Sequence, residues 1–249
     1  MQIQPWLHLV GSDQFGLTAY DDSNLYLLDG GNGNYALVDA GRLSSFEVML
    51  ENVRKAGASP EQIGTVLLTH GHTGHSEACA LLRQRYGTKV VIHANGVEFL
   101  RTGTSLARRF MEAYQKPEKP YVFPTFEPDV VIEDSWEIRI GRISIQALHI
   151  TGHTEDSVCY LAHVDGAKAL FSGDTVFFNG MVGLLNLPGC NLDHYRQDIL
   201  RLEDLGIGQL YPAHGIFVLR NGQLHVDMAI QQFRKPHVPV SYYEGLKLI

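Results

Sequence analysis

Residues 68–75 of this chain read Leu-Thr-His-Gly-His-Thr-Gly-His and place three histidines within six residues. A short apolar, β-branched run at 65–69 predicts a strand that ends in this stretch, and a helical pattern follows it. Imidazole is the commonest neutral ligand for zinc, so His70, His72 and His75 in one loop are already partly organised to converge. A lone loop histidine is more often solvated, but three at this spacing favour metal binding.

Outward from this loop, the first part of the chain predicts a series of strands and helices. Apolar runs bounded by turn residues predict strands at 6–10, 24–28, 35–39 and 89–93. Helical spacing is found in Phe46, Met49, Leu50 and Val53. Ser44 and Glu47 are placed to form the capping box of that helix, and Gly57 lies just past its end.

The second part of the chain repeats this order, with strands first and a helix after them. Strands are predicted at 130–132, 136–140, 143–149, 157–163, 167–171 and 209–211, and a helix is predicted from Leu192 to Gly206. The pattern predicts an α/β (α+β) protein with two mixed sheets packed face to face and helices outside. We expect one domain over 1–249, with residues 102–128 as an insertion or lid over the core.

Composition restricts the classes of function. The chain has 249 residues, of which 45% are hydrophobic, enough for one large core. The formal net charge is −7 without a Lys/Arg run, which disfavours nucleic acid and membrane partners. No signal-peptide pattern is found, so a cytoplasmic location is expected. Cys79, Cys159 and Cys190 lack paired spacing and are expected to be free thiols.

Three more potential ligands follow predicted strands in glycine-containing turns. His153 stands in Thr-Gly-His-Thr, Asp174 in Ser-Gly-Asp-Thr and His214 in Pro-Ala-His-Gly. Each of them alone has an ordinary explanation, because a loop histidine can bond a carbonyl and an aspartate can form an Asx turn. Beside the first histidine cluster, they become candidate ligands at loops that gather function.

In this order the motifs resemble the metallo-β-lactamase superfamily and its glyoxalase II and lactonase branches, whose pattern is His-x-His-x-Asp-His followed by Gly-His, Gly-Asp and Gly-His-type turns. The resemblance covers nearly the whole chain and implies a four-layer αββα sandwich. It implies that a first metal is held by His70, His72 and His153, that Asp174 bridges, and that a second metal is held by His75 and His214.

Asp39, in Val38-Asp39-Ala40-Gly41, resembles the family's early Asp-x-Gly turn. The resemblance implies that this residue orients the metal loop and does not bind metal. A simple turn residue is the alternative interpretation.

The sequence departs from the family pattern at Gly74, where the aspartate of the first motif is expected. Glu77 and Asp156 are the nearest carboxylates, and neither is expected to replace it. The first site keeps a full ligand set, whereas the second has one negative charge fewer. We therefore expect a one-metal or unevenly loaded two-metal centre, unless Gly74 is an isolated change that impairs an ordinary member.

These features predict a zinc hydrolase that attacks an ester, lactone, thioester or lactam through a metal-bound hydroxide. Asp174 is the expected catalytic acid–base. One or two zinc ions are expected as the cofactor, with iron and manganese as alternatives. The rival functions are a persulfide dioxygenase-like oxidoreductase with iron on His70, His153 and Asp174, and a binding or regulatory member of the fold.

A small-molecule substrate is expected, and its selection is predicted to lie in two aromatic and aliphatic segments, residues 102–128 and 176–194. The same side chains could instead pack onto the core. The C-terminal tail, residues 236–249, is apolar and aromatic. It is expected to dock either on its own domain or on a second copy, so a homodimer stays open.

Overall fold

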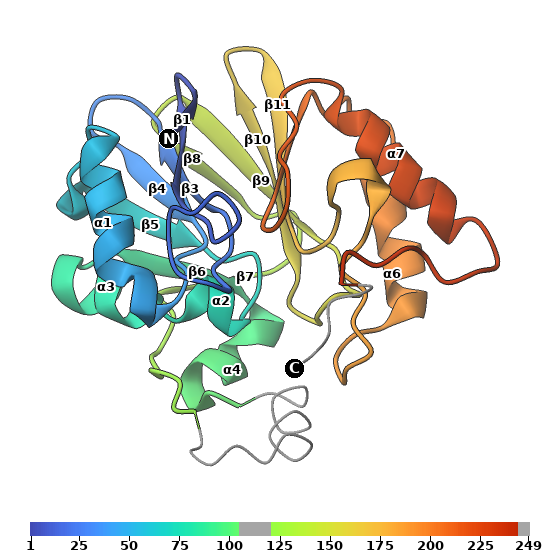
Figure 1. Cartoon of the computed structure of the whole chain (residues 1–249), viewed down its shortest axis with the longest axis horizontal. Coiled ribbons are helices and arrows are strands. Elements are labelled where there is room, and N and C mark those ends of the chain that lie inside the picture. The colour runs from blue at the N-terminus through green and yellow to red at the C-terminus, as the bar shows by residue number, and fades with distance from the viewer. Residues whose placement is uncertain (105–120, 244–249) are drawn as a thin grey trace.

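Two β-sheets lie face to face in the centre of the molecule, with helices on both outer sides (Figure 1). The computed structural model describes residues 1–104 and 121–243. Within these residues the first sheet has seven strands in chain order and the second has five in the order β12-β11-β10-β9-β8. The predicted αββα sandwich of two mixed sheets is confirmed.

The first sheet is antiparallel from β1 to β4 and parallel from β4 to β7. Its strands are β1 (Gln2–Gln4), β2 (Leu7–Gly11), β3 (Leu25–Asp29), β4 (Tyr35–Val38), β5 (Ile63–Leu67), β6 (Lys89–His93) and β7 (Val130–Ile132). The helices of this half are α1 (Phe46–Lys55), α2 (Thr73–Ser76), α3 (Cys79–Tyr86) and α4 (Val97–Thr102), with short 3-10 turns η1 (Leu43–Ser45), η2 (Pro60–Gln62) and η3 (Ala94–Gly96).

The second sheet is antiparallel from β8 to β11, and β12 pairs with β11 in parallel. Its strands are β8 (Glu137–Ile140), β9 (Ile143–His149), β10 (Val158–Val164), β11 (Ala167–Gly173) and β12 (Gln209–Pro212). Its helical segments are η4 (Phe178–Gly180), α6 (Leu192–Asp198), η5 (Ile199–Leu202) and α7 (Gly222–Phe233).

Alternation along the central strands builds the layers. Successive side chains of a strand point to opposite faces, so a strand buried on both sides is apolar throughout. On β3, Tyr26 packs between the sheets and Leu27 packs toward the helices of the first half. On β10, Tyr160 faces the other sheet and Leu161 packs toward the helices of the second half. Apolar cores thus lie between the sheets and beneath both helical layers.

The predicted strands are confirmed, with ends that differ by one or two residues. The helix at α1 is also confirmed, but its predicted capping box is wrong. Ser44 lies in the turn η1, which runs directly into α1, and the N-cap residue Ser45 makes no side-chain cap. The Ser45 hydroxyl accepts a hydrogen bond from Ala19 N, and Glu47 pairs with Arg85.

Part of the segment predicted as an insertion lies against the core. Residues 102–104 and 121–128 are described, and among them Phe123 is buried with Phe99 against the first half. The helical stretch predicted around residues 108–114 lies outside the described residues. A role for 102–128 as a lid stays a prediction.

Cys79, Cys159 and Cys190 are free thiols, as expected, and the first two are buried. Within the described ranges, no helix is both long enough and apolar enough to cross a membrane.

Candidate metal centre

Loops from both sheets meet at one edge of the sandwich. The six predicted ligands all lie there: His70, His72, His75, His153, Asp174 and His214. The first three follow β5, and the others follow β9, β11 and β12, one after each strand. These loops converge because the carboxyl-terminal ends of the strands reach the same edge. The structure thus brings together residues that are more than 140 positions apart in the sequence.

The first group consists of His70, His72, His153 and Asp174, with one donor atom from each residue within 4.8 Å of the others. His72 Nδ1 lies 2.9 Å from His70 Nε2 and 3.2 Å from His153 Nε2. His153 Nε2 lies 3.3 Å from Asp174 Oδ2. Three imidazole nitrogens and a carboxylate oxygen are a complete ligand set for a tetrahedral zinc ion.

The second group shares Asp174 with the first group. His75 Nε2 lies 3.7 Å from Asp174 Oδ2, and His214 Nε2 lies 3.7 Å from Asp174 Oδ1. Oδ1 therefore faces His214, whereas Oδ2 lies near histidines of both groups, so this carboxylate is placed to bridge them. This group has two imidazoles and one shared carboxylate, which is a weaker set for a dication than the first.

The electrostatics of the first group favour neutral imidazoles with free lone pairs. Burial lowers the pKa of His70 and His153, and burial with the neighbouring imidazoles lowers that of His72 to about 3. Burial alone would raise the pKa of Asp174, but His214, His75 and His153 together hold it well below its usual value. Neutral imidazoles around an ionised carboxylate are the protonation states that a metal ion needs.

His75 differs from the other histidines. Burial lowers its pKa, but the carboxylates of Asp39 and Asp174 outweigh burial and raise it above the ordinary value. Protonation of His75 would therefore compete with a cation at this position.

Asp174 also carries an unsatisfied polar atom. Its Oδ1 is buried and accepts no hydrogen bond within the described residues. A buried carboxylate oxygen without a donor is costly unless another group compensates it. A divalent cation among these ligands would compensate it, so the residues present fit a metal ion.

Contacts behind the ligands fix how their rings face the site. Asp39 accepts hydrogen bonds from Thr69 N at 2.8 Å and from His75 Nδ1 at 2.8 Å. His153 Nδ1 donates to the Gly183 carbonyl at 2.6 Å. Both histidines thereby turn Nε2 toward the site, and this carboxylate or carbonyl support is typical of metal-binding histidines. The contacts of Asp39 are those of a residue that orients the metal loop.

The position of the missing carboxylate is covered by another loop. Gly74 lies in α2, and a Cβ built on it would lie 2.9 Å from the Asp21 carbonyl oxygen. The Ser23 hydroxyl donates to the Gly74 carbonyl at 2.9 Å. The nearby carboxylates point elsewhere, since Glu77 accepts from Leu43 N at 3.0 Å and Asp156 accepts from Gly71 N at 2.8 Å. Neither of these carboxylates belongs to the ligand groups.

One contact of the site was not predicted from the sequence. The hydroxyl of Tyr243 donates a hydrogen bond to Asp174 Oδ2. The sequence indicated an aromatic tail that docks, and the described part of the tail docks on its own domain. Nothing in the sequence placed that aromatic ring beside the ligands.

A pocket of about 290 Å³ opens beside the first group and is bordered by His72 and His153. Leu185 and Leu187 line it from the predicted segment 176–194, and Thr104 lines it from 102–128. Both segments therefore reach the pocket. The described lining also contains Phe99, Glu98, Glu155 and Asp156, but neither Lys nor Arg.

This fold and this site define a class of protein, the αββα sandwiches with paired histidine and aspartate clusters at the ends of their strands. The chain belongs to the metallo-β-lactamase superfamily, since the sequence model of that superfamily matches residues 20–214. The resemblance inferred from the motifs is confirmed.

Curated relatives include a hydroxyacylglutathione hydrolase of Francisella tularensis, 27% identical over 154 residues that cover 61% of this chain and 50% of the relative. A probable metallo-hydrolase of Bacillus subtilis is 30% identical over 139 residues, which cover 56% of this chain and 60% of that protein. The chain spans about half the length of the first of these relatives.

Solved structures share the fold. The metallo-β-lactamase GOB-18 from Elizabethkingia meningoseptica has a TM-score of 0.70 and 20% identity, with 94% of this chain and 87% of that chain covered. A metallo-β-lactamase family protein from Thermus thermophilus has a TM-score of 0.72 and 20% identity, with 94% of this chain and 81% of that chain covered. At this identity the likeness shows the fold and leaves the substrate open.

Proposed function

We propose that this chain is a zinc-dependent hydrolase that cleaves an acyl bond in a small molecule: an ester, lactone, thioester or lactam. The observation that supports this proposal most directly is that two ligand groups share one buried carboxylate beside an open pocket. The relatives described as hydrolases support this proposal. Thioesters are included because one of those relatives is a hydroxyacylglutathione hydrolase.

His70, His72 and His153 would hold the first ion together with Asp174, and His75 and His214 would hold the second through the same carboxylate. Because the second group has one carboxylate fewer than the family pattern, it is expected to bind its ion more weakly. The chemistry that such an ion supplies when bound is activation of water and polarisation of the substrate carbonyl.

The remaining tasks fall to residues of the chain itself. Asp174 would also be the group that accepts a proton from the attacking water and returns it to the leaving group. Leu185, Leu187 and Phe99 give the pocket an apolar wall that excludes water from the acyl group.

The charge of the pocket narrows the substrate class. Glu98 and Glu155 border it, and its described lining has no cationic side chain. A leaving group that carries carboxylates, such as the glutathione thiol, would meet these two acidic side chains, and the described part of the lining offers no Lys or Arg to pair with it. The described lining, with its two glutamates and its apolar wall, therefore favours a neutral or cationic substrate with an apolar acyl part.

Metal content and hydrolysis measured together test the proposal. Protein purified after zinc supplementation, and separately after iron supplementation, is analysed for both metals and assayed on neutral aryl esters, thioesters and lactones. We expect about one to two zinc ions per chain, as this ligand set allows, and hydrolysis that chelation abolishes. Iron with oxygen uptake would instead support the dioxygenase, and metal-free, inactive protein would support a binding member.

A pair of variants links the metal to the residues. His153→Ala removes one ligand of the first group, and His163→Ala removes an exposed histidine of β10 outside both groups. Loss of zinc is expected in the first variant only. Wild-type zinc content in His153→Ala would overturn the ligand assignment.

A further inference from the structure

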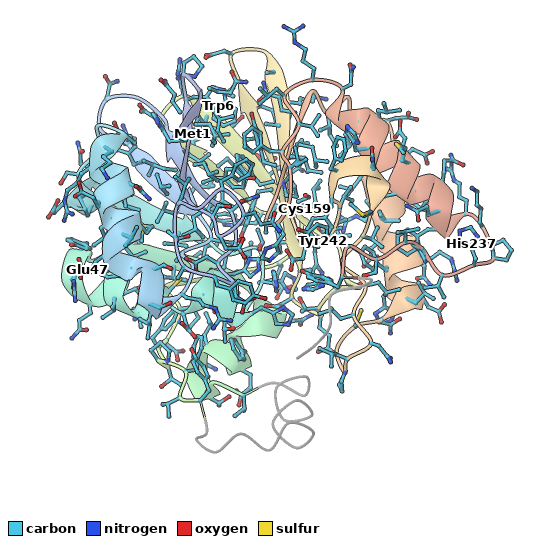
Figure 2. All side chains as sticks on the ribbon, viewed as in Figure 1. Met1, Trp6, Glu47, Cys159, His237 and Tyr242 are labelled. Atoms are coloured by element: carbon cyan, nitrogen blue, oxygen red, sulfur yellow. The ribbon has the colours of Figure 1, made fainter. Side chains whose placement is uncertain are left out.

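The C-terminal tail returns from the periphery of the molecule to its centre. Figure 2 shows His237 at the outer edge of the second half and Tyr242 near the middle of the view. Between these residues the backbone of the tail pairs with that of Val182. Val182 N donates to the Val240 carbonyl at 3.1 Å, and Tyr242 N donates to the Val182 carbonyl at 2.9 Å. The tail is therefore held by main-chain hydrogen bonds on both sides of Ser241.

This anchoring continues directly into the metal centre. The Ser241 hydroxyl donates to the Leu184 carbonyl at 2.7 Å. Gly183, between the residues that hold the tail, provides the carbonyl that orients His153. The same short segment thus fixes both a predicted ligand and the tail, which leaves Tyr243 little freedom to move relative to that ligand.

The phenol of Tyr243 lies between the two ligand groups. Its hydroxyl donates to Asp174 Oδ2, the oxygen 3.3 Å from His153 Nε2 and 3.7 Å from His75 Nε2. The Tyr243 ring stacks against the ring of His153 with a centroid distance of 6.1 Å and meets the ring of His214 edge-on at 6.4 Å. The hydroxyl therefore reaches the shared carboxylate from the middle of the ligand set.

Tyr242 packs beside the ligand groups and belongs to neither of them. Its ring stacks on Phe177 at 4.3 Å and lies nearly parallel to His214 at 6.3 Å. Its hydroxyl accepts a hydrogen bond from Gln14 Nε2 and makes no contact with Asp174 among the described hydrogen bonds. Two adjacent tyrosines thus approach the centre, but one hydroxyl reaches a ligand and the other does not.

The shared carboxylate needs such support. Among the residues that the structure describes, Asp174 is the one carboxylate of both ligand groups, and Gly74 adds none. A carboxylate that must serve two ions can turn about its Cβ–Cγ bond and lose one of them. A hydrogen bond to one oxygen fixes this rotation and leaves a second lone pair of that oxygen free for a metal.

We propose that Tyr243 is a positioning residue of the metal centre, whose hydroxyl fixes the rotation of Asp174 and compensates in part for the carboxylate missing at Gly74. This inference rests on the proposed metal centre. The tail is then a structural part of the active site, and the site is open to substrate on the side of His72 and His153, where the pocket lies.

The variant Tyr243→Phe tests this role, because it removes the hydroxyl and keeps the ring. Tyr242→Phe is the matched control. Zinc affinity is measured by competition with a chromophoric chelator on the full chain, with circular dichroism to verify folding. We expect Tyr243→Phe to weaken zinc binding by about tenfold or more, the usual effect of losing a hydrogen bond to a metal ligand, and Tyr242→Phe to bind as wild type.

A double-mutant cycle shows whether the hydroxyl acts through Asp174. In an Asp174→Asn background, Tyr243→Phe should change zinc affinity little, because the carboxylate that it positions is gone. Equal zinc affinity of Tyr243→Phe and wild type, or the same loss in both backgrounds, would overturn the positioning role. Absence of zinc binding by the wild type would instead overturn the proposed function, so the two failures are distinguishable.

Discussion

Replacement of Gly74 by aspartate would restore the family's carboxylate, and the structure gives its cost. A Cβ at this position meets the Asp21 carbonyl oxygen at 2.9 Å, so the covering loop must move. Overpacking of this kind costs about 1–3 kcal/mol. Relief of glycine's unfavourable entropy in a helix returns roughly 0.5–1 kcal/mol. The metal-free variant should therefore be less stable than wild type by up to about 2.5 kcal/mol, the largest difference between these two ranges.

With zinc bound, Gly74→Asp should instead be more stable than wild type. The added carboxylate gives the second group another ligand, and an ion that binds only the folded state stabilises it by mass action. Gly74→Ala is the matched control, because it adds the same Cβ without a ligand. The assays are metal content per chain and urea unfolding, each with zinc and with chelator.

We expect Gly74→Ala and Gly74→Asp to lose similar stability in chelator, and only Gly74→Asp to gain zinc content and stability in zinc. Equal zinc content in both variants would refute the reasoning that the second group lacks a carboxylate. Full wild-type stability of Gly74→Ala in chelator would refute the steric argument.

Three further predictions concern residues around the site and beyond it. Burial and the adjacent imidazole of His149 lower the pKa of His93 to about 4. The unfolded chain therefore binds more protons between pH 4 and 6.5, and the free energy of unfolding should fall by up to about 3 kcal/mol as the pH drops through that window. Urea unfolding of chelated wild type and His93→Gln checks this, and an equal pH slope in both would contradict it. Asp39→Asn keeps a side chain that tolerates the positive φ of 61° but places an amide against His75 Nδ1. The zinc affinity measured in the competition assay should therefore fall about 10- to 100-fold. An unchanged affinity would exclude an orienting role for Asp39. A Glu98→Gln, Glu155→Gln double variant should raise kcat/KM for an anionic thioester relative to a neutral one by roughly tenfold at low salt, whereas an unchanged ratio would show that these carboxylates do not select substrate.

The layers of the fold could be predicted because each depends on a local pattern. Apolar runs bounded by turn residues predicted the strands, and the order of the runs predicted two mixed sheets. Helix α7 was missed, although Val226, Ala229, Ile230 and Phe233 have helical spacing and form its buried face. The capping box failed because a preceding turn, which the spacing of Ser44 does not reveal, took over the helix start.

The candidate site was predictable to the extent that its ligands stand in short glycine-containing motifs after strands. Their convergence followed from the resemblance and was found in the structure, whereas metal binding itself stays a prediction. The contact of Tyr243 with Asp174 could not be predicted, because the two residues are 69 positions apart and the segment around Tyr243 has no motif. The contact between Gly74 and the Asp21 carbonyl was equally hidden, since it depends on how one loop lies over another.

The ligands are divided between the two sheets, so a metal ion at this centre would connect the two halves of the molecule. Three ligands come from the half that contains β5, and three come from the half that contains β9 to β12 (Figure 1). An ion held by both sets can bind only when the two halves are docked, so its binding energy opposes their separation. Removal of the ion would therefore weaken the contact between the two halves at this rim and leave the apolar contact between the sheets to hold them together.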